Sequence, residues 1–166
     1  MNRRIALAAA IVSVSIAAAA CRRDGPARPD WRVIHLYAGE TSVDLLQHPA
    51  RVQMFRIDPD RPRAKEGEPH VGPYAASTTP VDVPADVAAE LSKLLADAGS
   101  YDWQHMKNAP FRPRVGLTFQ RGAYALEIAL DLESAKLKVF AGDQPLPWQD
   151  CDPARDRLAA IVKRVL

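Results

Sequence analysis

Strict alternation of apolar and polar side chains in the C-terminal half constrains the fold of this chain more than any other feature. Over residues 124–132 every second position is apolar, and the positions between hold alanine, glutamate and aspartate. A two-residue period is that of a β-strand with one face in a core. Shorter alternating runs at 115–119 and 137–139 complete a predicted three-stranded antiparallel meander. The face that carries the carboxylates is expected to lie outside the core.

Two segments have the spacing of amphipathic helices. Residues 84–98 place their large apolar side chains on one stripe, with Pro84 suited to the first turn and Gly99 to the position after the last turn. Asp152 and Pro153 are typical of the start of a second, closing helix. The two stripes consist of Val87, Leu91, Leu94, Leu95 and Ala98, and of Leu158, Ile161, Val162 and Val165.

The segment before the first long helix predicts two more strands and a short helix. Residues 32–38 predict a strand, Thr41 and Ser42 cap a short helix that ends before Pro49, and the alternation over 51–57 predicts a second strand. The sequence therefore predicts an α+β fold. Its antiparallel sheet combines the meander with these N-terminal strands, and two main helices pack on one face.

Residues 58–83 differ from the rest of the predicted domain because they are rich in proline. Five prolines fall in this segment and a sixth, Pro84, adjoins it. Each proline removes a backbone donor and fixes φ, so a long regular element is not expected there. The segment predicts a long loop, with one short edge strand near residues 69–74.

The N-terminal residues have the order of a bacterial secretory signal. A basic start at residues 1–4 is followed by an uncharged apolar run over 5–20 that ends in small residues. As a helix the run would span roughly 24 Å, less than the ~30 Å hydrocarbon core of a bilayer. Residues 1–20 are therefore predicted to be a signal peptide, and residues 21–30, with one glycine and two prolines, a tether. Residues 31–166 form the predicted single domain.

The segment Ala18-Ala19-Ala20-Cys21 resembles the lipobox of bacterial lipoproteins, although Ala18 stands where leucine is usual. In that family the cysteine becomes the first mature residue and carries diacylglycerol on its sulfur. The resemblance implies an anchor through Cys21 on the periplasmic side of a bacterial membrane. Ala18 and Ala20 equally suit a peptidase that releases a soluble periplasmic or secreted protein, so both alternatives stay open.

The state of the second cysteine depends on the first. If Cys21 is lipidated, Cys151 is a lone thiol; if Cys21 is free, the two could pair in an oxidising compartment. A reactive Cys151 is the third alternative, but the flanking Asp150 and Asp152 oppose formation of a thiolate. We expect an inert thiol before a disulfide, and a disulfide before a nucleophile.

Charge excludes one class of partner. Of the 22 basic side chains, Arg3 and Arg4 lie within residues 1–20, and the remaining 20 balance the 20 acidic ones. A chain of zero net charge gives no electrostatic reason to expect binding to nucleic acid.

No catalytic or cofactor-binding motif occurs in the sequence, and the four histidines lie far apart. We therefore expect neither a cofactor nor a metal site, and an enzyme is the less favoured class. The candidate binding residues follow the first long helix: Trp103, His105, Arg112 and Arg114. Trp103 and Met106 could instead close the end of the core. Arg121 could join the other two arginines in an anion-binding corner, although solvated strand ends are favoured.

From residue 51 to the C-terminus, the order of segments resembles a group of small uncharacterised bacterial envelope proteins. The segments that carry the resemblance are Val52-Gln53-Met54-Phe55-Arg56-Ile57-Asp58-Pro59, Val71-Gly72-Pro73-Tyr74, Phe111-Arg112-Pro113-Arg114-Val115-Gly116-Leu117-Thr118-Phe119, residues 124–132 and Asp152-Pro153-Ala154-Arg155. Cysteines frequent in that group are replaced here by Ala109, Asp131 and Ser134, so no redox or metal role carries over. The resemblance implies an envelope location and no defined activity.

Two functional hypotheses follow. The first is a non-catalytic, membrane-anchored periplasmic domain that contacts another envelope component, such as an envelope protein. The alternative is a small envelope enzyme or inhibitor whose site lies near His105, Arg112 and Arg114. A cleft that joins these three side chains to a carboxylate would favour the alternative.

Overall fold

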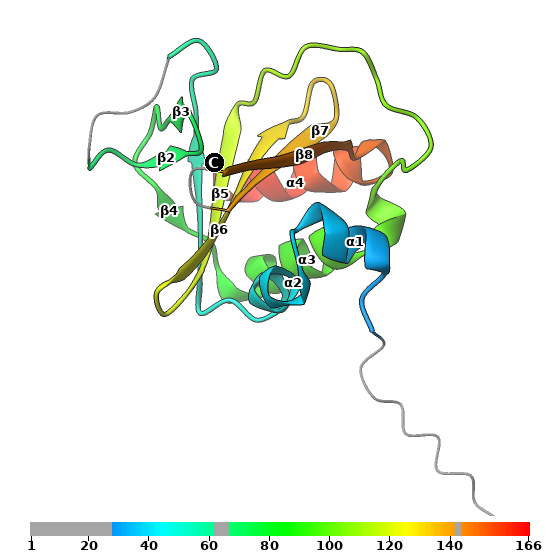
Figure 1. The fold of residues 1–166 in the computed structure, drawn as a ribbon. Helices are drawn as coiled ribbons and strands as arrows, with labels where there is room; N and C mark the ends of the chain where they lie inside the picture. The colour runs from blue at the N-terminus through cyan, green and yellow to red at the C-terminus, as the bar shows by residue number, and fades with distance from the viewer. Residues whose placement is uncertain (1–27, 62–66, 142–143) are drawn as a thin grey trace, which may run out of the picture.

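The computed structural model describes residues 28–61, 67–141 and 144–166. The predicted signal peptide, Cys21 and most of the tether therefore lie outside the described residues. The described chain forms an α+β fold with a sheet of six antiparallel strands in the order β4-β1-β5-β6-β7-β8 and a separate small hairpin, β2-β3 (Figure 1). The strands of the large sheet are β1 (Arg51–Arg56), β4 (Val81–Asp82), β5 (Val115–Arg121), β6 (Tyr124–Asp131), β7 (Lys136–Ala141) and β8 (Gln144–Asp150).

The helices cover one face of this sheet, and the hairpin covers part of the other (Figure 1). The main core lies between the helices and the face that presents Val52, Leu117 and Ile128. A smaller apolar cluster lies under the hairpin and includes Phe55 and Phe140. The helices are α1 (Trp31–Leu36), α2 (Glu40–Gln47), α3 (Ala85–Ala96) and α4 (Arg155–Val165), with short 3-10 turns at Ala98–Ser100 and Asp152–Ala154; the hairpin strands are β2 (His70–Val71) and β3 (Tyr74–Ala75).

The meander, β1 and both main helices form where the sequence predicts them. The register Val52↔Phe119 and Met54↔Leu117 places apolar residues of β1 and β5 side by side on the helix-covered face. The last predicted strand is followed by one more strand, β8, which the sequence analysis missed. Its prolines at 145 and 147 cannot donate a ladder hydrogen bond, so they suit a strand at the edge of the sheet.

Residues 31–36 form a helix, so the predicted strand over 32–38 is wrong. Val33, Leu36 and Tyr37 are buried, and their spacing of three and four residues fits one face of a helix. The Asp30 side chain caps this helix by accepting a hydrogen bond from the backbone N of Arg32 at 2.9 Å. A short apolar run fits the alternation of a strand as well as the spacing of a helix. The Asp30 cap favours the helix.

Three finer expectations are also corrected. The carboxylate-bearing face of β6 is not left to solvent, because Ala129 and Asp131 are buried there. Residues 70–75 pair with each other as a hairpin, and β4 is the edge strand instead. Gly99 does not end α3 in a left-handed conformation: Asp97 ends the helix in an extended conformation, and its side chain accepts from Gly99 N at 2.9 Å. No helix within the described ranges is long and apolar enough to cross a bilayer.

Candidate functional site

The segment between α3 and β5 holds the binding residues that the sequence analysis selected. Trp103 is half-buried against the core, and its Nε1 donates to the carbonyl of Ala98 at 2.8 Å. Its ring lies 5.1 Å from that of Tyr101, and the Arg32 guanidinium lies 5.2 Å above its centroid. Trp103 therefore closes the end of the core. Met106, expected to share that role, is 64% exposed.

The other three candidates do not converge on one another. His105 is exposed, with Nδ1 3.4 Å from Asp102 Oδ2. The pKa of Asp102 is lowered mainly by hydrogen bonds from the backbone N of Gln104 and of His105. Arg112 pairs with Asp60 at 2.6 Å, and Arg114 is exposed just before β5.

An open hollow of about 350 Å³ adjoins Arg112, together with Ala109, Pro110, Asp131, Glu133 and Ser134. Neither His105 nor Arg114 lines it. Arg121 lies at the other end of β5 and pairs with Asp44 at 2.6 Å, so the three arginines do not form one anion-binding corner.

Buried charged groups near this hollow hold the 102–114 segment in place. Lys136 is 2% exposed, and its Nζ donates to the carbonyls of Lys107 and Ala109, both at 2.6 Å. Its Nζ also lies 4.0 Å from the centroid of the Trp148 ring. Asp150 Oδ2 accepts from the backbone N of Lys107 at 2.7 Å. The contacts of Lys136 and of Asp150 Oδ2 pair groups that would be costly to bury alone, and they give both residues a structural role. Asp150 Oδ1 is buried without a hydrogen-bond partner among the described residues.

The facing charged residues of β6 and β7, Asp131 and Lys136, bind other groups and not each other. Asp131 lies opposite Lys136 in the register, but Lys136 donates to the two carbonyls instead. Asp131 accepts from the backbone N of Arg112, Glu133 and Ser134 and from the Ser134 hydroxyl. It therefore organises the β6–β7 turn and the start of β5.

The Cys151 thiol is buried, with 1% of the residue exposed. Burial, and secondarily the charges of Asp152 and Asp150, raise its pKa to about 12. Because the thiolate is the nucleophile, the raised pKa opposes the alternative of a reactive Cys151 at neutral pH. The alternative pairing with Cys21 involves a residue outside the described ranges.

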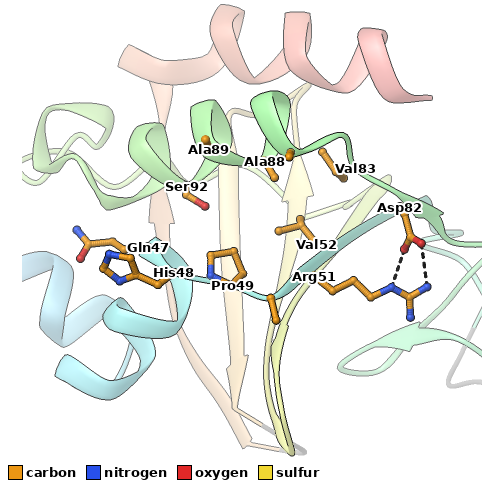
Figure 2. Close-up of a pocket in the computed structure, with 12 residues that line it drawn as sticks. Gln47, His48, Pro49, Arg51, Val52, Asp82, Val83, Ala88, Ala89 and Ser92 are labelled. Carbon is orange, nitrogen blue, oxygen red and sulfur yellow. Dashed lines mark hydrogen bonds and ion pairs between the residues drawn. The ribbon is translucent and has the colours of Figure 1, made fainter.

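A larger cavity, which the sequence analysis did not identify, lies between β1 and α3 (Figure 2). Its volume is about 420 Å³. The α2–β1 connection, β1, β4 and α3 each contribute to its walls. The lining residues are Gln47, His48, Pro49, Ala50, Arg51, Val52, Asp82, Val83, Ala85, Ala88, Ala89 and Ser92.

Small side chains on α3 create the space. The helix turns Leu91, Leu94 and Leu95 into the core, and the neighbouring strip of its surface carries only alanines and Ser92. These small residues recur at spacings of three and four, so they fall on one face of the helix. Pro49 and Val52 lie across the gap (Figure 2). The local sequence of α3 therefore determines one wall. The packing of α3 over β1 then forms the cavity.

Ser92 is the polar group inside this cavity. It is only 4% exposed, and its Oγ makes no hydrogen bond within residues 28–61, 67–141 and 144–166. Figure 2 shows its side chain extending from α3 toward Pro49 on the opposite wall. A buried hydroxyl without a partner costs about 1–3 kcal/mol. Such a group is one that a bound molecule can satisfy.

Paired charges surround the mouth of the cavity. Arg51 binds Asp82 through two contacts, Nε–Oδ1 at 2.7 Å and a second guanidinium nitrogen to Oδ2 at 3.0 Å (Figure 2). The pKa of Asp82 is lowered mainly by its hydrogen bond with Arg51. His48 Nδ1 lies 3.0 Å from Asp44 Oδ1, and the same carboxylate pairs with Arg121. The formal charges of the two arginine–aspartate pairs at the mouth cancel.

The residue types of a serine hydrolase are present, but their geometry is not. Asp44 contacts His48 as the third member of a catalytic triad would. Ser92 Oγ, however, makes no hydrogen bond to any described residue, including His48. A serine nucleophile needs that contact with its base. Within the described ranges, no group of three or more His, Cys, Asp or Glu side chains could hold a metal ion.

No protein-family model, no curated protein and no solved structure matches this chain. The one signal in the sequence that could have indicated the cavity is the run of small residues at helical spacing in α3. The residues of the opposite wall carry no such signal, because they are brought there by the packing of β1.

Proposed function

We propose that this chain is a non-catalytic, membrane-anchored domain of the bacterial envelope that takes a small ligand into the cavity between β1 and α3. One observation carries the binding part of the proposal: the Ser92 hydroxyl is buried at the cavity wall and lacks a hydrogen-bond partner within the described ranges. The cavity volume of about 420 Å³ also falls in the usual range of small-molecule sites, roughly 300–1,000 Å³.

The anchor part of the proposal is supported by the sequence. The apolar run over 5–20 is short, and the resemblance to a lipobox places Cys21 at the first mature position. Two or three acyl chains make such an attachment stable, whereas one is marginal. Residues 21–30 could extend at most ~35 Å, at roughly 3.3–3.6 Å per residue. The domain would then face the periplasm close to the membrane, where an envelope protein could also contact it.

The binding proposal is tested on the purified full chain by a fragment screen read by ¹H–¹⁵N NMR shifts. We expect shifts concentrated on Val52, Val83 and Ala88. The variant Ala89→Leu narrows the cavity from an exposed position on its wall and is expected to abolish them. Ala159→Leu makes the same change at an exposed position of α4 and is the matched control. Shifts that survive in Ala89→Leu, or that cluster instead around Arg112, would refute the proposal.

The anchor is tested separately in the host. Labelling with palmitate, sensitivity of processing to globomycin and loss of membrane fractionation in Cys21→Ala are the expected results. A Cys21→Ala protein that partitions as the unaltered chain does would remove the lipid anchor and favour the soluble periplasmic or secreted alternative.

A further inference from the structure

We infer that the ligand of this cavity is an uncharged aliphatic molecule whose carbonyl oxygen accepts a hydrogen bond from Ser92, as an amide or ester would. This inference rests on the proposed binding function and specifies its chemistry. It follows from the nature of the walls, the position of the single buried donor and the charge balance at the mouth.

The walls favour an aliphatic body. Val52, Val83 and Ala88 present methyl groups, and Pro49 adds a saturated ring. Among the described lining residues the only aromatic ring is the His48 imidazole, whose side chain is 69% exposed at the mouth. A planar aromatic ligand would therefore find no ring to stack on inside the cavity. Contact between aliphatic surfaces is the interaction that these walls offer.

The buried hydroxyl favours an oxygen acceptor at one end of that body. Ser92 Oγ carries a proton, and no described acceptor takes it. A carbonyl oxygen at this end of the cavity would supply the missing partner. Because the Ser92 residue is almost fully buried, the ligand group that meets it must leave water. Leaving water is far less costly for a neutral carbonyl than for an ion.

The charges around the cavity also favour a neutral ligand, because they are already paired with one another. A carboxylate beside Ser92 would need a cation, but Arg51 already binds Asp82 through two contacts at the mouth. An ammonium group would need a carboxylate, but Asp82 and Asp44 are both paired with arginines. Each ion would have to break an existing pair or remain uncompensated in a poorly solvated place.

Three probes of equal chain length test the inference: hexanamide, hexanoate and hexylammonium, each titrated into the purified full chain at neutral pH. We expect the ¹H–¹⁵N shifts of Val52, Val83 and Ala88 to give hexanamide a dissociation constant at least tenfold lower than that of either ion. The variant Ser92→Ala is expected to weaken hexanamide binding by about two- to tenfold, the usual effect of one hydrogen bond. It should leave the weak binding of the two ions unchanged.

The outcomes separate this inference from the proposed function. If hexanoate or hexylammonium binds the cavity as tightly as the amide, or if Ser92→Ala leaves hexanamide binding unchanged, the inference is wrong while the binding function stands. If the fragment screen finds ligands for the cavity but hexanamide is not among them, the inference again fails alone. If neither the fragments nor the probes shift the cavity residues, both fail.

Discussion

Replacing Ser92 with alanine should make the ligand-free protein more stable, because the change removes a buried hydroxyl that no described residue satisfies. Removing the unsatisfied hydroxyl contributes about 1–3 kcal/mol to the free energy of unfolding. Alanine also has the higher helix propensity, worth a few tenths of a kcal/mol in the interior of α3. We therefore expect the free energy of unfolding to rise by about 1–3 kcal/mol, which for a chain of this size raises Tm by roughly 2–4 °C per kcal/mol.

The chain offers a matched control in Ser100. Both serines are 4% exposed, but the Ser100 Oγ donates to the carbonyl of Leu94 at 2.6 Å. Ser100→Ala loses that hydrogen bond and leaves the carbonyl with only the longer contact from the backbone N of Asp97, at 3.4 Å, so it should destabilise the protein by about 1 kcal/mol. The two substitutions are chemically identical and similarly buried, and they differ in the hydrogen-bond partner of the hydroxyl and, by a few tenths of a kcal/mol, in helix propensity. The changes in the free energy of unfolding are therefore expected to have opposite signs in the two variants.

Urea titrations followed by circular dichroism measure both changes, with native mass spectrometry used first to verify that no ligand has been carried through purification. The slope of the transition should be the same in both variants, since the surface exposed on unfolding hardly changes. If Ser92→Ala destabilises the protein as much as Ser100→Ala does, the Ser92 hydroxyl has a partner in solution. That result would refute a ligand acceptor at this position.

Three further predictions concern other parts of the fold. Gly72 has φ of +50°, and a Cβ there would lie 2.4 Å from the Phe140 ring, so Gly72→Ala should undock the β2–β3 hairpin and speed hydrogen exchange of its amides. Lys136→Met removes both donors to the carbonyls of Lys107 and Ala109 and should destabilise the protein by about 1–3 kcal/mol, measured by urea titration. The Cys151 pKa is raised to about 12 from an ordinary value of 9.0, so unfolding, which frees the thiol to ionise, should become easier as pH rises from about 9 toward 12. A Cys151→Ala variant should lose part of that alkaline slope; an unchanged slope would assign it to other groups, such as Tyr37 and Tyr101, whose pKa values burial also raises.

The sequence predicts those elements of the fold whose residues show a clear hydrophobic period or a helix cap. The strands over 115–139 follow from alternation, and α3 and α4 follow from their apolar stripes. Residues 32–38 predict a strand but contribute to a helix, because a short apolar segment fits the period of either element until the Asp30 cap is considered. Strand β8 escaped prediction because its prolines oppose a central strand, and only its pairing with β7 makes it an edge.

The second face of the sheet and the cavity could not be predicted because both depend on contacts between distant segments. Ala129 and Phe140 become buried only when the hairpin docks across the sheet, and Gly72 of that hairpin donates its backbone N–H to Glu127 at 2.9 Å. Likewise, Ser92 follows the sequence pattern of a solvated helix face. It becomes a buried group only because the α2–β1 connection and β1 pass beside α3.

The cavity is not explained by loose packing of the fold as a whole. On the other face of the sheet, a Cβ added to Gly116 would lie 2.6 Å from the Phe55 ring, and one added to Gly72 would lie 2.4 Å from that of Phe140. The chain uses glycine there so that aromatic rings can fill the space, as dense protein interiors require. Beside β1 it instead combines small residues on α3 with a buried hydroxyl, although larger aliphatic side chains on that strip would close the gap. A place where small residues and a buried hydroxyl leave space, in contrast to the aromatic packing on the other face, is where a binding function is most expected.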